Sequence, residues 1–128
     1  MVPKDLSYTN EHEWIRVEGN VGTVGITDHA QGALGDVTFV ELPETGAELL
    51  RGDEVCAIES AKAAASIYAP AGGKIAEANG DLESAPGLIN SDCYGKGWVY
   101  KIELSDPADV ASLMDAEAYE RFLAEEEH

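Results

Sequence analysis

The stretch EVCAIESAKAAASIY, residues 54–68, decides the fold of this chain. Its two apolar runs, residues 54–60 and 65–68, stand on either side of the four-residue segment AKAA. Short apolar runs that meet at a turn are typical of paired β-strands. We therefore expect a β-hairpin that carries Lys62 at its tip.

Strand-like runs separated by turn residues continue on both sides of this hairpin, over residues 12–104. The pattern predicts further strands over residues 12–18, 21–26, 37–42, 74–78 and 97–104. Thr27 and Asp28 are candidate N-caps for a short helix over residues 28–34, which Gly35 would end. Residues 79–96 are rich in turn formers and predict mostly loop. Many short strands at regular spacing favour a mainly β sandwich or barrel.

The C-terminal part has a different pattern. Asp106 followed by Pro107 is a strong helix start, because Asp caps a helix and Pro suits its first position. Tyr119 and Leu123 share one helix face that can pack on the sheets. We expect a helical segment at about 106–124 on a core of about 8–104, together one domain of 128 residues. We expect the acidic tail, residues 125–128, to be frayed.

The charge of the chain is strongly acidic, with 25 acidic and 8 basic residues and a net charge of -17. Such a surface repels nucleic acids and anionic membranes, and it suits protein partners with basic patches. It could equally serve solubility alone. No window is long and apolar enough to span a bilayer, and the N-terminus lacks a signal core. Cys56 and Cys93 match no metal or redox spacing, which favours a reducing compartment, so we expect the cytoplasm.

Lys62 is one of five lysines and has small residues on both sides. A lysine framed by alanines at a hairpin tip is open to an enzyme that modifies its ε-amine. An ammonium group is not a nucleophile, so a transferring enzyme must deprotonate the ε-amine before acylation. On the spacing alone, a plain solvent-exposed turn lysine is the simpler interpretation.

Catalysis by the chain itself receives little support. His12 and Glu13 resemble the start of a zinc-binding helix motif, but Arg16 stands where the second histidine is required. The three histidines are scattered, and the chain has neither a nucleophile elbow nor a phosphate loop. We therefore expect no enzymatic activity and no metal site. Glu13, beside Trp14 at the start of the sheet, is a candidate to hold a polar group on a docked cofactor.

Together, these motifs resemble the H-protein family of the glycine cleavage system. They follow the order and spacing of that family over roughly nine-tenths of the chain, which chance does not produce. The matching stretches are HEW at 12–14, VGITDHAQ at 24–31, LGDV at 34–37, FVELP at 39–43, ESAKA at 59–63, IYAP at 67–70, LINS at 88–91, GW at 97–98, and DA at 115–116 with Tyr119.

The resemblance implies a fold and a function. The fold is a lipoyl-domain barrel-sandwich hybrid of two small antiparallel sheets, with lipoate bound covalently to Lys62. The chain would be a monomeric, non-catalytic carrier that receives an aminomethyl group from glycine decarboxylase, the P protein. It would pass that group to the aminomethyltransferase, the T protein, and be reoxidised by dihydrolipoamide dehydrogenase, the L protein. A lipoylating enzyme is a further implied partner.

The resemblance also assigns roles to single residues. Lys62 falls on the lipoylated lysine, and Glu59 on the acid that lipoylating enzymes read. Glu13 falls on an acid proposed to hold the loaded arm in a cleft. Where many members have Ser-Asp after the lysine segment, this chain has Ala65 and Ser66, so Ser66 would be a weaker, neutral partner for the arm.

Two smaller departures are Ala61 in place of Val or Thr and Cys93 in place of Pro. With the change at Ser66, they leave open a second hypothesis, a paralogous lipoyl carrier that relays lipoyl groups or carries sulfur intermediates. A biotin carrier uses the same hairpin lysine, but it usually has Met on both sides, where this chain has Ala61 and Ala63.

Overall fold

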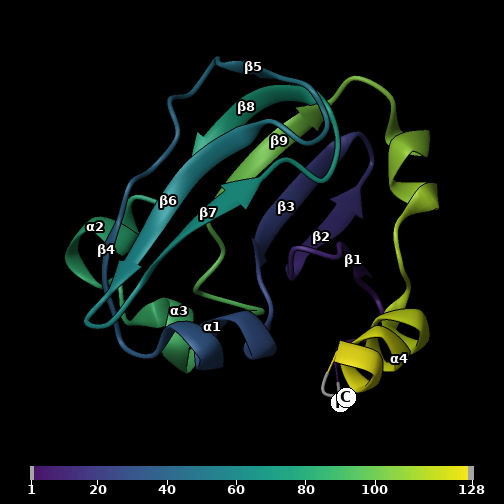
Figure 1. The fold of residues 1–128 in the computed structure, drawn as a ribbon. Coiled ribbons are helices and arrows are strands. Elements are labelled where there is room, and N and C mark those ends of the chain that lie inside the picture. The colour runs from purple at the N-terminus through teal and green to yellow at the C-terminus, as the bar shows by residue number, and fades with distance from the viewer. Residues whose placement is uncertain (1, 127–128) are drawn as a thin grey trace.

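Two antiparallel β-sheets form the framework of the structure, a computed structural model that describes residues 2–126 (Figure 1). The larger sheet has the strand order β1-β2-β3-β9-β8-β5, and the smaller has the order β4-β6-β7. The strands are β1 (Ser7–Tyr8), β2 (Glu13–Glu18), β3 (Val21–Ile26), β4 (Val37–Val40), β5 (Glu48–Leu49), β6 (Glu54–Ser60), β7 (Ala64–Tyr68), β8 (Gly73–Ala78) and β9 (Tyr100–Leu104). The helices are α1 (Asp28–Leu34), α2 (Asp81–Ser84), α3 (Leu88–Ser91), the 3₁₀-helix η1 (Pro107–Ser112) and α4 (Ala116–Glu126).

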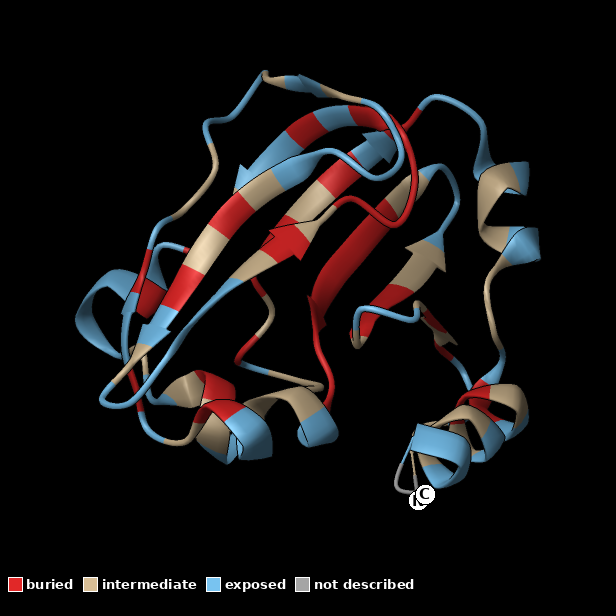
Figure 2. Cartoon of the chain, in the orientation of Figure 1, coloured by how far each residue is buried: buried red, intermediate tan, exposed pale blue. Residues whose placement is uncertain are grey.

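The predicted mainly β fold of two antiparallel sheets is confirmed, and within residues 2–126 neither sheet closes into a barrel. The sheets share one apolar core, in which Ile58 and Ile67 of the smaller sheet pack with Ile75 and Ile102 of the larger. Figure 2 shows the resulting alternation of buried and exposed residues along the strands. Burial of these side chains is the main favourable term holding the two sheets together.

Local signals explain why several elements form where the sequence predicts them. The β2–β3 hairpin turns at Gly19, whose φ of +66° suits glycine. Helix α1 has its predicted bounds: the Thr27 hydroxyl accepts a hydrogen bond from the Ala30 N–H at 3.3 Å. Gly35, with φ of +80°, then ends the helix.

Other predicted boundaries are wrong. The strand expected over residues 37–42 ends at Val40, and the last strand begins at Tyr100 rather than at residue 97. Two-residue strands β1 and β5 were not predicted, and the expected loop over 79–96 contains α2 and α3. Each of these helices has four residues and buries one side chain, Leu82 or Ile89. A single turn is too short to show helical periodicity in the sequence.

The C-terminal segment also differs from one continuous helix. Asp106 does cap a helix, but this helix is η1, whose Ala108 N–H lies 3.0 Å from the Asp106 carboxylate. Met114 then forms a β-bridge with Tyr8, and α4 begins only at Ala116. Tyr119 of α4 stacks on Tyr8 with 4.6 Å between the ring centroids, which docks α4 against β1. Residues 127 and 128 of the expected frayed tail lie outside the described residues.

Both cysteines are unpaired and buried. Cys56 of β6 is a core residue, and Cys93, in the segment expected as mostly loop, is only 7% exposed. Burial raises the pKa of the Cys56 thiol to about 12 and that of the Cys93 thiol to about 11. Both groups are therefore neutral thiols at physiological pH.

None of the helices within residues 2–126 is long and apolar enough to cross a membrane.

Candidate functional site at the β6–β7 hairpin

The β6–β7 hairpin ends in a very short loop. The last paired residues are Glu59 and Ala64, and the Ser60 N–H then donates a hydrogen bond to the Ala63 carbonyl at 2.8 Å. Only Ala61 and Lys62 lie beyond that bond. The tip is exposed and lies at the lower left of the molecule (Figures 1 and 2).

The Ser60 hydroxyl holds this loop in shape. Its oxygen accepts hydrogen bonds from the N–H groups of Ala63 at 3.0 Å and Lys62 at 3.3 Å. A serine that accepts from the backbone two and three residues ahead stabilises a turn. Ala61 also donates its N–H to the Asp36 carbonyl at 3.2 Å, which ties the tip to the link between α1 and β4.

The Lys62 side chain lies against the end of α1. A Cβ built on Gly35 would stand 3.2 Å from Lys62 Cε, so a side chain at this position would press on the lysine stem. The positive φ of Gly35 favours glycine there as well. The ion pairs found among residues 2–126 do not include Lys62. Its ammonium group is thus exposed on a supported stem.

Asn90 of α3 fixes the backbone beneath that stem. Its amide nitrogen donates to the Gly35 carbonyl at 2.8 Å and to Gln31 Oε1 at 3.0 Å. Its amide oxygen accepts the Val37 N–H at 2.9 Å. Sequence reasoning missed this role because Asn90 falls in a segment predicted as loop, where asparagine is an ordinary turn residue.

A mainly apolar cleft of about 220 Å³ lies between α1, the β1–β2 loop and β7. Its walls include Ala33 and Leu34, the residues just before the glycine that supports the Lys62 stem. The complete lining is Glu11, His12, Glu13, Ile26, Ala30, Ala33, Leu34, Ile58, Ala65, Ser66 and Ile67. Two of the predicted site residues, Glu13 and Ser66, therefore meet in one cleft.

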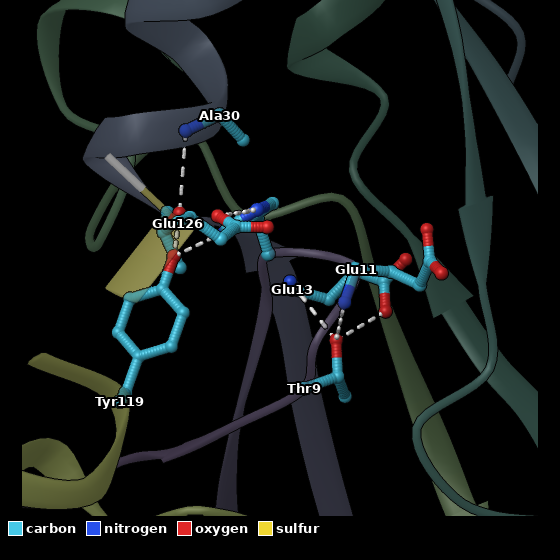
Figure 3. A network of polar contacts seen from close by, with 8 residues as sticks. Thr9, Glu11, Glu13, Ala30, Tyr119 and Glu126 are labelled. Carbon is cyan, nitrogen blue, oxygen red and sulfur yellow. Dashed lines mark hydrogen bonds and ion pairs between the residues drawn. The ribbon is translucent and has the colours of Figure 1, made fainter. Parts of the chain in front are cut away.

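Glu13 lies in the wall of this cleft and is 2% exposed. One carboxylate oxygen accepts the Tyr68 N–H at 2.9 Å. The other accepts the hydroxyl proton of Thr9 at 2.7 Å, and Figure 3 shows Thr9 beside Glu13. Burial raises the pKa of the Glu13 carboxyl, and these two hydrogen bonds act against that rise. The carboxylate connects β2 of the larger sheet with β7 of the smaller one, so it also has a structural role.

Ser66 lies on β7 and Glu59 on β6, the two strands of the hairpin. The Ser66 hydroxyl donates its proton to Glu54 Oε1 at 2.8 Å, so it cannot at the same time donate a hydrogen bond to a docked group. Glu59 is exposed outside the cleft and pairs across the sheet with Phe39, whose side chain is 54% exposed. Strand β6 therefore carries an exposed acid, paired with an exposed aromatic residue of β4, three residues before Lys62.

A polar network next to the cleft was not anticipated from the sequence. His12, which has φ of +65°, places Nδ1 2.8 Å from the Tyr119 hydroxyl. That hydroxyl lies 2.8 Å from Thr27 Oγ1, which caps α1 (Figure 3). Burial lowers the pKa of His12, and the neighbouring Glu126 carboxylate acts against this shift. The histidines that are scattered in sequence are not all scattered in space, because the rings of His12 and His29 lie 4.5 Å apart.

Two small antiparallel sheets that present a lysine at a hairpin tip are the arrangement of the lipoyl- and biotin-carrier class of β-domains. The family model described as glycine cleavage H-protein matches residues 6–126. The chain belongs to this family, as its sequence motifs predict.

Individual relatives agree with the family match. The chain is 56% identical over 124 residues to a glycine cleavage system H protein of Symbiobacterium thermophilum, covering 97% of both chains. It is 52% identical to one of Thermotoga maritima, covering 96% of this chain and 99% of that one. The crystal structure of a glycine cleavage system H protein from Mycobacterium marinum superposes with a TM-score of 0.88 at 37% identity, covering 96% of this chain and 99% of that chain. These matches confirm the predicted carrier role in glycine cleavage.

Proposed function

We propose that Lys62 is the residue through which this chain acts as a carrier, with lipoate bound as an amide to its Nζ. The observation that carries the proposal is the exposed lysine on a two-residue loop that Ser60 holds in place. Attachment joins Nζ to the carboxyl carbon of an activated lipoyl donor, and the amine loses a proton as the activating group leaves. The product is a neutral amide, so one positive charge disappears from the tip.

The surroundings of Lys62 suit recognition by a lipoylating enzyme. Small side chains at Ala61 and Ala63 let an active site close around the amine. We assign Glu59 as the acidic residue that this enzyme recognises, because Glu59 is exposed and lies three residues before Lys62. The half-exposed ring of Phe39, paired with Glu59 across β4 and β6, adds apolar contact area.

The cleft fits an apolar arm with a polar end. Its walls next to the Lys62 stem are aliphatic, and Glu13 and Ser66 supply oxygens within them. When bound, the lipoyl dithiolane supplies two sulfurs that can be reduced and can hold the aminomethyl group. The Glu13 carboxylate would attract an amine in the cleft, and the Ser66 oxygen can still accept a hydrogen bond after donating to Glu54. The apolar walls would exclude water from the docked group.

The partners follow from this carrier role. We propose that the chain itself catalyses no reaction and serves in turn the glycine decarboxylase, the aminomethyltransferase and the dihydrolipoamide dehydrogenase. A tether of this kind raises the effective concentration of the carried group at each active site. With a net charge of -17, the chain would meet basic patches on these partners most rapidly. We further propose that residues 1–128 act as a single domain and as a monomer.

The attachment site can be tested by lipoylation in vitro followed by intact mass measurement and peptide mapping. The wild-type chain should gain one lipoyl group on the peptide that contains Lys62, and Lys62→Ala should gain none. Lys74→Ala is the matched control, because Lys74 is another exposed lysine of the same fold and should not affect the modification. Modification of Lys62→Ala to the wild-type extent would reject the proposal.

Lipoylation does not distinguish the glycine-cleavage carrier from a paralogous lipoyl carrier, because both hypotheses require it. A second assay distinguishes the two. The feature that favours it is Ser66, a neutral residue that already donates to Glu54 where many family members have an acid. The lipoylated chain should support exchange of labelled bicarbonate into the carboxyl group of glycine with the decarboxylase. Correct lipoylation without exchange would favour the paralogous role.

A further inference from the structure

Beyond the carrier site, the structure gathers a second set of chemically active side chains. His12 of the β1–β2 loop, His29 of α1 and Glu126 of α4 each offer one ligand atom, and these atoms lie within 4.8 Å of one another. They come from three elements that are far apart in the sequence. We propose that they form a binding site for one divalent transition-metal ion of the zinc type.

The donor set fits such an ion. Two imidazole nitrogens and one carboxylate oxygen are ligands that zinc, copper, cobalt and nickel accept, whereas magnesium prefers oxygen alone. Zinc–nitrogen bonds of about 2.1 Å place tetrahedral donors about 3.4 Å apart. His12 Nε2 and Glu126 Oε2 already lie 3.1 Å apart. His29 and Glu126 are exposed, so rotations of their side chains can close the remaining gap.

The buried polar network orients His12 for this role. Its Nδ1 faces the Tyr119 hydroxyl at 2.8 Å, and that hydroxyl is held in turn by Thr27 at 2.8 Å. A histidine whose Nδ1–H is donated to a fixed partner keeps the lone pair of Nε2 available for a metal. Here Nε2 points to Glu126 and the ring packs against His29 at 4.5 Å. Tyr119 is thus a positioning residue, and the open fourth coordination position would hold water.

A metal ion at this place would act as a clamp. It would join the last turn of α4 to α1 and to the loop that begins β2, next to the wall of the arm cleft that His12 forms. Metal binding therefore should stiffen α4. The ion would take no part in the carrier chemistry, and the inference does not depend on the attachment of lipoate to Lys62.

The proposal is tested by titrating the full, tag-free and unlipoylated chain with Zn²⁺. A His128→Gln background excludes the histidine that lies outside the described residues. We expect one ion per chain with a dissociation constant on the order of 1–10 µM, as suits an open three-ligand site. The ring resonances of His12 and His29 should shift together in histidine-selective NMR spectra, and amide exchange in α4 should slow.

Variants locate the site. His29→Gln and Glu126→Gln should each weaken Zn²⁺ binding at least tenfold, and both residues are exposed enough to be replaced without unfolding the chain. Glu125→Gln removes the same charge from the neighbouring position and should leave the affinity unchanged. Tyr119→Phe should weaken binding by about tenfold while keeping one ion per chain, as expected of a residue that only orients a ligand.

Three results would overturn the proposal. The first is the lack of saturable Zn²⁺ binding below about 1 mM, the weakest affinity that a specific site would show. The second is unchanged affinity in His29→Gln. The third is an equal response to Mg²⁺, which would mean that the acidic surface merely attracts cations.

Discussion

Removal of the Glu13 carboxylate should destabilise the protein by about 2–4 kcal/mol. Glu13→Ala leaves the partly buried Tyr68 N–H, which cannot turn to water as a hydroxyl can, without its acceptor, and this costs about 1–3 kcal/mol. The vacated volume beside the core adds about 1 kcal/mol. Loss of the Thr9 hydrogen bond adds little, because that hydroxyl is only partly buried and can turn to water. The desolvation that raises the pKa of Glu13 is relieved by the substitution, so the upper end of the range will not be exceeded.

Urea unfolding followed by tryptophan fluorescence measures this change, since Trp14 is fully buried in the native protein. The melting temperature should fall by roughly 10 °C in a chain of this size. Glu11→Ala is the matched control: it removes an exposed acid two residues away and should change stability by less than about 0.5 kcal/mol. Glu13→Gln keeps the shape and one acceptor, so it should cost only about 1 kcal/mol. A Glu13→Ala protein as stable as wild type would refute the reasoning that the carboxylate holds the two sheets together.

Other substitutions and reagents test the same structure. Gly25→Ala should cost about 2–3 kcal/mol in urea unfolding, because its Cβ would stand 2.6 Å from the buried Trp14 ring, and a neutral result would contradict this packing. Gly32→Ala should instead stabilise α1 by about 0.5–1 kcal/mol, since nothing lies within 4 Å of its Cβ; a loss of stability would count against a regular helix there. At pH 8 the native thiols of Cys56 and Cys93 should react with an aromatic disulfide far more slowly than those of the urea-unfolded chain, and rapid native labelling would show that one is accessible. Because their pKa values of about 12 and about 11 exceed the ordinary value of 9.0, the unfolded thiols ionise first, so stability should fall as pH rises above 9.

Much of the fold could be predicted because the informative signals are local. The cap at Thr27 and the positive φ at Gly35 define both ends of α1 within nine residues. The β6–β7 hairpin is equally local, since two apolar runs flank a tip of small residues. The elements that were missed, β1, β5, α2 and α3, have two to four residues each and exist through contacts with distant segments. Such elements carry no periodicity that a sequence pattern can reveal.

Part of the candidate site could likewise be predicted from local sequence signals, and part could not. Lys62 and Glu59 are adjacent on one hairpin, so motif and spacing identify them together. The platform beneath Lys62 depends on Asn90 of α3, whose three hydrogen bonds reach 53 to 59 residues back along the chain. Glu13 could be named from the sequence, but its bond to Tyr68 across 55 residues could not.

The sequence by itself determined the β-rich architecture and the hairpin with its lysine, and it identified the family. These features depend on strand alternation, turn residues and motif spacing, which are all local properties of the sequence. Only the tertiary structure decided what surrounds that lysine. Packing the two sheets places Glu13 and Ser66 in one cleft and brings His12, His29 and Glu126 together from three elements. Burial and side-chain hydrogen bonds between distant segments arise only when the chain folds, and for that reason they cannot be predicted from local sequence patterns.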